Sequence, residues 1–196
     1  DSARLQHPFR RWVEFCRKED SRFSSGPLHS VLLWGNVIPT SSVVLRRKEA
    51  LGIGMFDEGL TMVAEDYDYW LRLSLRYPAV YAEEALVSYL VRETGLSGPF
   101  KTQAIRYLLS TVRVLEKHLR ETGTGLSEEA RTVIKRRAAT LRYRLGTIHL
   151  KKGEAKSAVS EIRQALSGCK TVGLEFADRR TSWFERPWLF LKPYGV

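Results

Sequence analysis

The chain has 196 residues, of which 43% are hydrophobic and 28% are charged, and its net charge is +10. This composition supports a folded core and excludes a disordered chain, and the length suits one medium domain or a small domain with an appendage. No apolar run approaches the roughly 20 residues that a membrane-spanning helix needs, and no signal peptide is visible at the front.

The positive charge is concentrated in one part of the chain. Residues 101–170 carry 16 Lys and Arg against 6 Asp and Glu, whereas residues 1–100 carry 12 against 13. Such a segment can attract nucleic acid, an anionic membrane or a diphosphate, but a solvated helical face explains it more simply. Since no RNP or zinc fingerprint accompanies the charge, we expect no nucleic-acid partner.

The two cysteines, Cys16 and Cys169, lie far apart in the sequence. Their small number and wide spacing favour free thiols in a reducing compartment. We therefore expect a cytoplasmic protein without a disulfide.

The first hundred residues mix helix and strand signals. Apolar residues recur at helical spacing between Phe9 and Cys16, which predicts a helix. The segment Asn36–Arg47, NVIPTSSVVLRR, is rich in β-branched residues and predicts a strand. Pro39 cannot donate a hydrogen bond to a neighbouring strand, so we expect it at the start of this strand or at a sheet edge.

Further elements follow at short intervals. RKEALGIG predicts a short helix that Gly52 and Gly54 end, and the apolar stripe after Tyr67 predicts a helix that stops before Pro78. Residues Ala79–Val91 read as a short strand, an acidic turn and a second strand. This half of the chain is therefore mixed α/β.

After Pro99 the sequence is helical in character as far as Gly168. The break ETGTGLSEEA interrupts it, and there Ser127 is a good N-cap for the helix that follows. Small residues at Gly146 and Ala158 would let two antiparallel helices approach closely, with Gly153 at the turn between them. This spacing resembles a single tetratricopeptide repeat, and one repeat predicts a packed α-hairpin, not a binding superhelix.

Residues 171–196 combine aromatic and basic side chains, as in RRTSWFERPWLFLKPYGV. A segment of this kind can lie at a membrane interface. It can also fold back on its own domain to cover apolar surface, which is the commoner arrangement.

The stretch Val63–Pro78, VAEDYDYWLRLSLRYP, contains an acidic cluster. Asp66 and Asp68 spell D-x-D, which can hold a divalent cation when both side chains point to one ion. In a helix, residues i and i+2 lie about 200° apart. The metal interpretation is therefore weak, and we assign no metal ligand in this chain. Asp68 is expected on the helix surface, paired with Arg72 at i+4.

Glu65 and Asp66 allow two interpretations. At a helix N-terminus the unpaired N–H groups favour carboxylates, so both acids can simply cap the helix. Asp66, exposed beyond the helix end, can instead act as a general base if a substrate hydroxyl lies within hydrogen-bond reach. The residue types alone leave both interpretations open.

The segment 36–78 resembles the acceptor-side half of family-two glycosyltransferases of the GT-A fold. IPTSSVVLRR, GMFDE and AEDYDYWLRL carry the resemblance, in the same order and spacing as in the family. A weaker similarity extends from Arg10 to Ser97. The resemblance implies transfer of a sugar from a nucleotide diphosphate sugar to an acceptor hydroxyl with inversion, in the synthesis of glycan or cell-envelope polysaccharide.

The same resemblance implies roles for individual residues. Asp66 matches the acid that takes the proton from the acceptor hydroxyl, and Glu65 would help to place the acceptor. Thr40 and Ser41 are implied contacts of the donor sugar or the acceptor. Many relatives have YRxH where this chain has YLVR, so Arg92 stands at the histidine position. Arg92 can pair with a diphosphate by fixed charge; alternatively, this part of the site is degraded.

We therefore expect residues 1–98 to form a partial GT-A-like α/β domain, with a mixed sheet and flanking helices. Residues 99–170 would be a helical appendage with one tetratricopeptide-like hairpin, and residues 171–196 a basic aromatic tail. The family's donor-binding half would precede this chain, so we expect a fragment that is inactive alone.

A divalent metal, Mg or Mn, would belong to the full-length parent. The expected partners are a nucleotide-sugar donor and a glycan or lipid-linked acceptor. The tail leaves open a peripheral contact with the inner face of the membrane. A rival interpretation is a non-catalytic protein-interaction module that uses the basic helices.

Overall fold

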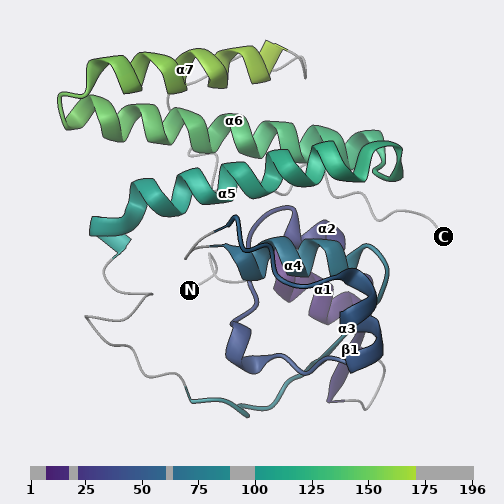
Figure 1. Ribbon diagram of the computed structural model, residues 1–196. Coiled ribbons are helices and arrows are strands. Elements are labelled where there is room, and N and C mark those ends of the chain that lie inside the picture. The colour runs from purple at the N-terminus through teal and green to yellow at the C-terminus, as the bar shows by residue number, and fades with distance from the viewer. Residues whose placement is uncertain (1–7, 18–21, 61–63, 89–99, 171–196) are drawn as a thin grey trace.

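The computed structural model of the chain describes residues 8–17, 22–60, 64–88 and 100–170. A region of short helices and two strands is followed by three long helices that lie side by side (Figure 1). This arrangement confirms the coarse prediction of a mixed α/β region followed by a helical region. The predicted domain boundary near Gly98–Pro99 and the tail 171–196 lie outside the described residues.

The described part begins with helix α1 (Pro8–Cys16), as predicted, and strand β1 (Phe23–Gly26) and the short helix α2 (His29–Leu32) follow. Two side chains fasten α1 to this strand and the turn after it. Ser24 Oγ donates to the Val13 carbonyl oxygen at 2.9 Å, and Trp12 Nε1 donates to the Pro27 carbonyl oxygen at 2.7 Å.

The rest of the mixed region surrounds one central helix. The 3₁₀ turn η2 (Thr40–Ser42) and helix α3 (Arg47–Ile53) precede α4 (Glu65–Ser74), which leads into strand β2 (Ala79–Ala82). β1 and β2 pair antiparallel, with Phe23 opposite Ala82. The helices α3 and α4 were predicted, and Gly54 ends α3 with a φ of +91°.

The strand predicted over Asn36–Arg47 does not form, and that prediction was wrong. The backbone turns at Pro39 instead, because Ser42 N and Ser42 Oγ both donate to the Pro39 carbonyl oxygen, at 2.9 and 2.7 Å. Such local hydrogen bonds compete with sheet formation. Residues 43–46 stay outside any sheet. The second strand predicted before Val91 is likewise absent over residues 85–88, and residues 89–91 lie outside the described part.

The helical region consists of α5 (Phe100–Thr122), the 3₁₀ turn η3 (Gly123–Gly125), α6 (Glu128–Lys151) and α7 (Ala155–Lys170). The predicted N-cap is confirmed, since Ser127 Oγ accepts from the Ala130 amide at 3.2 Å.

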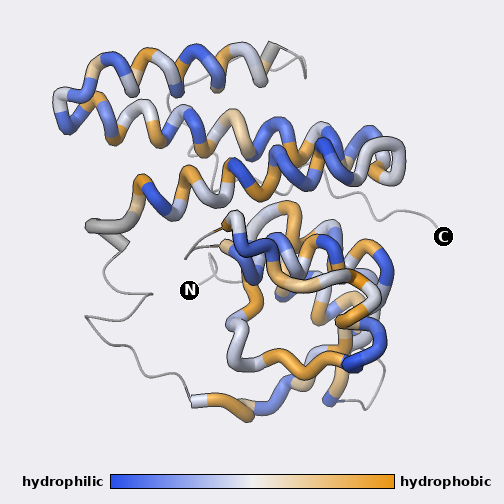
Figure 2. Tube along the Cα trace, viewed as in Figure 1, coloured by the Kyte–Doolittle hydropathy of each residue, from blue (hydrophilic) through white to orange (hydrophobic). Residues whose placement is uncertain are grey.

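A continuous hydrophobic core joins the two regions. Tyr67 and Leu71 of α4 belong to the same buried cluster as Leu115 of α5 and Ile134 of α6. Hydrophobic residues recur at intervals along the long helices, as the orange segments in Figure 2 show. Burying one large apolar side chain stabilises a fold by about 1.5–3 kcal/mol, so the helices contribute directly to the stability of the region that contains α4.

Cys16 and Cys169 are free thiols, as predicted. In the described part of the chain no helix combines the length and the apolar character needed to cross a membrane.

Close approach at Gly146 shapes the α6–α7 hairpin. A Cβ atom on Gly146 would lie 2.6 Å from Ile162 Cγ1 and 3.2 Å from the Ala158 carbonyl oxygen. The predicted close contact of two antiparallel helices is therefore confirmed. Gly153 lies at the turn with a φ of +77°, a conformation that glycine adopts without steric cost.

We expect Gly146→Val to lower the free energy of unfolding by about 1–3 kcal/mol, because the branched side chain must push α6 and α7 apart. Gly52→Val in α3 is the matched control, since a Cβ on Gly52 meets nothing within 4 Å and valine is slightly better than glycine in a helix. Urea denaturation measures both variants. An equal loss in the two would contradict this account of the hairpin.

A pair of histidines lies where α2 meets α5. His29 Nε2 and His118 Nε2 are 2.9 Å apart, so at least one ring must be neutral to accept a hydrogen bond. Burial, together with repulsion from His118, lowers the pKa of His29 to about 4, and burial is likewise the main cause that lowers the pKa of His118 to about 4. Both imidazoles therefore bind protons more weakly in the folded chain than the usual histidine with a pKa of about 6.5.

The stability that depends on these neutral rings is complete above about pH 6.5 and is lost as the pH falls towards about 4. We expect the double variant His29→Gln/His118→Gln to lose less stability than the parent over this range, because glutamine does not titrate. Urea denaturation at a series of pH values measures the difference. Parallel acid losses in both proteins would show that other groups cause the loss.

Candidate functional site at the start of α4

An unusual backbone conformation precedes α4. Ala64 has a φ of +77°, and among the described residues it is the one non-glycine residue with a positive φ. A residue with a Cβ atom adopts this conformation at a cost of about 1 kcal/mol or more. The turn places residues 65 and 66 in the first turn of the helix, where unpaired N–H groups favour carboxylates.

Hydrogen bonds from two sides fix the Asp66 carboxylate. Oδ1 accepts from Asn36 Nδ2 at 3.1 Å and from the Tyr67 amide at 2.6 Å, and Oδ2 accepts from Thr40 Oγ1 at 2.7 Å. Asn36 is itself oriented, because its Oδ1 accepts from the Ile38 amide at 3.3 Å. Asp66 is half-buried and Thr40 is exposed, so this held carboxylate lies at the protein surface.

The other three residues predicted for the site, Ser41, Glu65 and Arg92, are not among the hydrogen-bond partners of Asp66 in the described residues. Ser41 follows Thr40 in η2 and is exposed, and within the described residues it makes no hydrogen bond to Asp66. The Oε2 atom of Glu65 is buried and has no hydrogen-bond partner in the same part of the chain. Arg92 lies outside the described residues. The structure thus brings Thr40 to Asp66, and the roles of the other three stay predictions.

Asp68 faces away from Asp66, into the protein. Its side chain is 2% exposed, with Oδ2 2.9 Å from Arg72 Nε and Oδ1 2.8 Å from Lys117 Nζ. The predicted pair with Arg72 is confirmed, but the prediction that Asp68 lies on the helix surface was wrong, because α5 covers this side of α4. The two acids of the D-x-D therefore have separate partners and do not converge.

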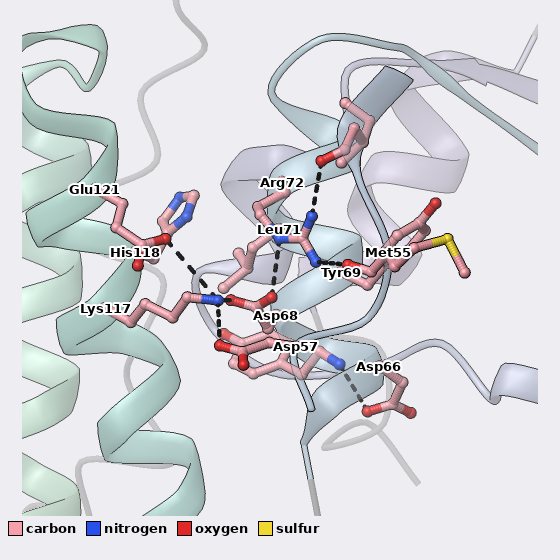
Figure 3. Close-up of polar contacts among 12 residues, drawn as sticks. Met55, Asp57, Asp66, Asp68, Tyr69, Leu71, Arg72, Lys117, His118 and Glu121 are labelled. Carbon is pink, nitrogen blue, oxygen red and sulfur yellow. Dashed lines mark hydrogen bonds and ion pairs between the residues drawn. The ribbon is translucent and has the colours of Figure 1, made fainter. Parts of the chain in front are cut away.

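Lys117 of α5 connects two carboxylates of the mixed region. Its Nζ lies 2.8 Å from Asp57 Oδ2 and 2.8 Å from Asp68 Oδ1, whereas Asp66 points away from it (Figure 3). Burial alone would lower the pKa of Lys117, but the hydrogen bonds to these carboxylates outweigh it and raise the pKa. The bond from Lys117, with one from the Gly59 amide, lowers the pKa of Asp57. Lys117 and Asp57 are therefore charged at neutral pH.

Arg72 extends the same network to the segment that follows α3. Its Nη1 and Nη2 donate to the carbonyl oxygens of Ile53 and Met55 at 3.0 and 2.9 Å. Its guanidinium carbon also lies 5.0 Å from the centre of the Tyr69 ring, within cation–π distance. The segment 53–57 is thus held on α4 by charged side chains.

A second cation of the helical region reaches the residue next to Asp66. Arg137 Nη1 of α6 lies 2.6 Å from the Tyr67 hydroxyl oxygen and 2.8 Å from the Leu33 carbonyl oxygen. The Tyr67 hydroxyl donates to the Leu32 carbonyl oxygen at 2.5 Å. Burial raises the pKa of Tyr67 to about 12, so the hydroxyl keeps the proton that it donates.

The described residues contain no group of three or more His, Cys, Asp or Glu that could hold a metal ion. Comparisons of the chain with protein-family models, with curated proteins and with solved structures give no match. The relation to family-two glycosyltransferases therefore depends on the three sequence segments that carry the resemblance, and it stays a hypothesis.

Sequence reasoning missed Asn36 and Lys117. Asn36 precedes Asp66 by 30 residues, and it had been placed in a strand whose pattern gives no indication of such a contact. Lys117 belongs to a strongly basic segment in which each cation resembles a solvated surface residue. Its burial follows from the packing of α5 on α4, which no local pattern reveals.

The two acids of the D-x-D should respond differently to amide substitution. We expect Asp68→Asn to lower the free energy of unfolding by about 3 kcal/mol, because it removes the charge that compensates two largely buried cations. Asp66→Asn keeps the shape of a surface side chain and should cost no more than about 1 kcal/mol. Denaturation of both variants in urea measures the contrast, and a larger loss for Asp66→Asn would reverse the assignment.

Proposed function

We propose that this chain is the acceptor-side part of a family-two-like glycosyltransferase, with Asp66 as the general base. The observation that carries the proposal is the half-buried Asp66 carboxylate, which Thr40 and Asn36 hold at the N-terminus of α4. The segments IPTSSVVLRR and AEDYDYWLRL, which resemble the family, supply Thr40 and Asp66, and they contact each other.

The hydrogen bonds leave Asp66 with capacity for a substrate hydroxyl. A carboxylate offers about four lone-pair sites on its two oxygens. Oδ1 accepts two hydrogen bonds, from Asn36 and the Tyr67 amide, while Oδ2 accepts one, from Thr40. The remaining site on Oδ2 is where an acceptor hydroxyl would bind, within the 2.6–3.2 Å or so that proton transfer requires.

In the proposed reaction, Asp66 takes the proton of the acceptor hydroxyl as its oxygen attacks the anomeric carbon. The glycosidic bond forms as the bond to the nucleoside diphosphate breaks, and the diphosphate leaves with that electron pair. Attack from the side opposite the leaving group inverts the anomeric centre. The described residues contain no group of three or more His, Cys, Asp or Glu that could hold a metal ion, and Mg or Mn would act on the donor in the parent protein.

Exposed apolar side chains near η2 and α3 support a larger α/β domain. Val44 is 96% exposed and Met55 is 72% exposed, and Leu51 and Phe56 are also exposed. The β-rich segment 43–46 has no strand partner among the described residues. Both features suit a surface that the donor-binding half of a GT-A-like domain would cover.

A protein-interaction module remains the rival function, and it makes Asp66 dispensable. Under that hypothesis, substitutions on the exposed faces of α6 and α7 would abolish a partner, while the site at α4 would have no role. The hydrogen bonds around Asp66 favour the transferase, because an acid that only caps a helix does not need Asn36 and Thr40 to orient it.

We expect Asp66→Asn in the full-length protein to reduce kcat by about 10²–10⁴-fold, the usual contribution of a general base, with the donor KM unchanged. Glu129→Gln is the matched control, because Glu129 is an exposed carboxylate in the first turn of α6. Sugar transfer from a panel of nucleotide diphosphate sugars measures both. Near-normal turnover by Asp66→Asn would refute the base assignment.

A further inference from the structure

Two cations of the helical region hold the residues that follow Asp66 in α4. In the described residues neither Lys117 nor Arg137 bonds to Asp66 directly, but each binds one of the two residues that follow it. Arg137 of α6 binds Tyr67, and Lys117 of α5 binds Asp68. The first turn of α4 is therefore held by one cation from each of two long helices.

The Lys117 contact fixes α4 relative to the turn after α3. The side chain of Lys117 is 15% exposed and lies between Asp68 on α4 and Asp57 on that turn, at 2.8 Å from each. Removing Lys117 would leave the buried Asp68 with Arg72 alone and would release Asp57. Because a buried carboxylate needs compensating charge, α4 and the turn would then shift to find new partners.

The Arg137 contact holds the neighbouring residue of the helix, Tyr67. The guanidinium carbon lies 5.4 Å from the centre of the Tyr67 ring, and Nη1 binds the Tyr67 hydroxyl and the Leu33 carbonyl oxygen. Tyr67 is 1% exposed, so its position is determined by these contacts and by the core. The same arginine therefore links α6, the end of α2 and the first turn of α4.

We propose that Lys117 and Arg137 are positioning residues for the base Asp66, so that the helical region forms part of the transferase site. This inference rests on the proposed function. Asp66 precedes Tyr67 and Asp68 in a rigid helical turn, so a displacement of those residues moves its carboxylate by a similar amount. A displacement of about 1 Å in a catalytic group can cost as much as 10²-fold in rate.

The test uses the full-length protein with the variants Lys117→Met and Arg137→Met. We expect each to lower kcat by about ten- to a hundredfold while the KM for the donor is unchanged, because neither residue belongs to the donor-binding half. The conservative variants Lys117→Arg and Arg137→Lys keep the cation, and they should recover a large part of kcat.

Arg142→Met is the matched control for a loss of stability alone. Arg142 of α6 also binds two carboxylates from other helices, with Nη2 2.7 Å from Glu116 Oε1 and Nη1 2.9 Å from Glu161 Oε2. Its side chain is 14% exposed, close to the value for Lys117, but it ties α5 and α7 to α6 away from α4. We expect it to lower the melting temperature as much as Lys117→Met does and to leave kcat within about twofold, because the start of α4 is untouched.

The outcomes separate this inference from the proposed function. Equal losses of kcat in all three methionine variants, or no loss in Lys117→Met and Arg137→Met, would overturn the positioning role while an inactive Asp66→Asn still supports the base. Normal turnover by Asp66→Asn would overturn both. If Lys117→Met does not fold, Asp57→Asn is the second variant, because it removes one of the two Lys117 partners from a partly exposed position. We then expect Asp57→Asn to lower kcat by the same factor, while Lys117→Arg keeps a large part of the parent kcat.

Discussion

The buried carboxylate of Asp68 joins the two parts of the molecule. Removing a carboxylate from water costs several kcal/mol unless cations and hydrogen bonds replace the solvent. Arg72 supplies one cation from the same helix, but the second, Lys117, comes from α5. The mixed region therefore cannot bury this acid at low cost without the helical region, and a hydrophobic core that runs from α4 into α5 and α6 reinforces the connection.

The arrangement also explains how one short acidic sequence provides two kinds of side chain. Asp66 and Asp68 are two positions apart, about 200° around the helix, so one faces the surface while the other faces α5. Among the described residues the side chain of the inward acid has two charged partners, Arg72 and Lys117, and these contacts determine where α4 lies. The outward acid has neutral partners, Thr40 and Asn36, which orient the carboxylate without neutralising it.

Local signals in the sequence predicted most of the helices. The apolar stripe after Tyr67 and the N-cap at Ser127 depend on neighbours within one helical turn, and both agree with the structure. The close contact at Gly146 could also be predicted, because a small residue on a helical face indicates that another helix approaches closely there, wherever that helix lies in the sequence. The sequence pattern gave a wrong prediction where the local structure depends on residues far away in the sequence. The β-rich segment 43–46 needs a partner strand, and without one the hydrogen bonds of Ser42 determine the local structure.

The candidate site shows the same division between local and distant information. Asp66 could be selected from its place at a helix start and from the resemblance, which also selected Thr40, although as a substrate contact and not as a partner of Asp66. The other residues that hold the start of α4 could not be selected. Asn36 reaches Asp66 across 30 positions of sequence, and Lys117 and Arg137 act on its neighbours from helices that look independent of the site. Ala64 also keeps a conformation that costs free energy. The start of α4 is therefore held against this cost by contacts from the segment 36–40, from α5 and from α6. A helix end needs none of these contacts simply to be capped, and a base that must meet a hydroxyl within a few tenths of an ångström does need them.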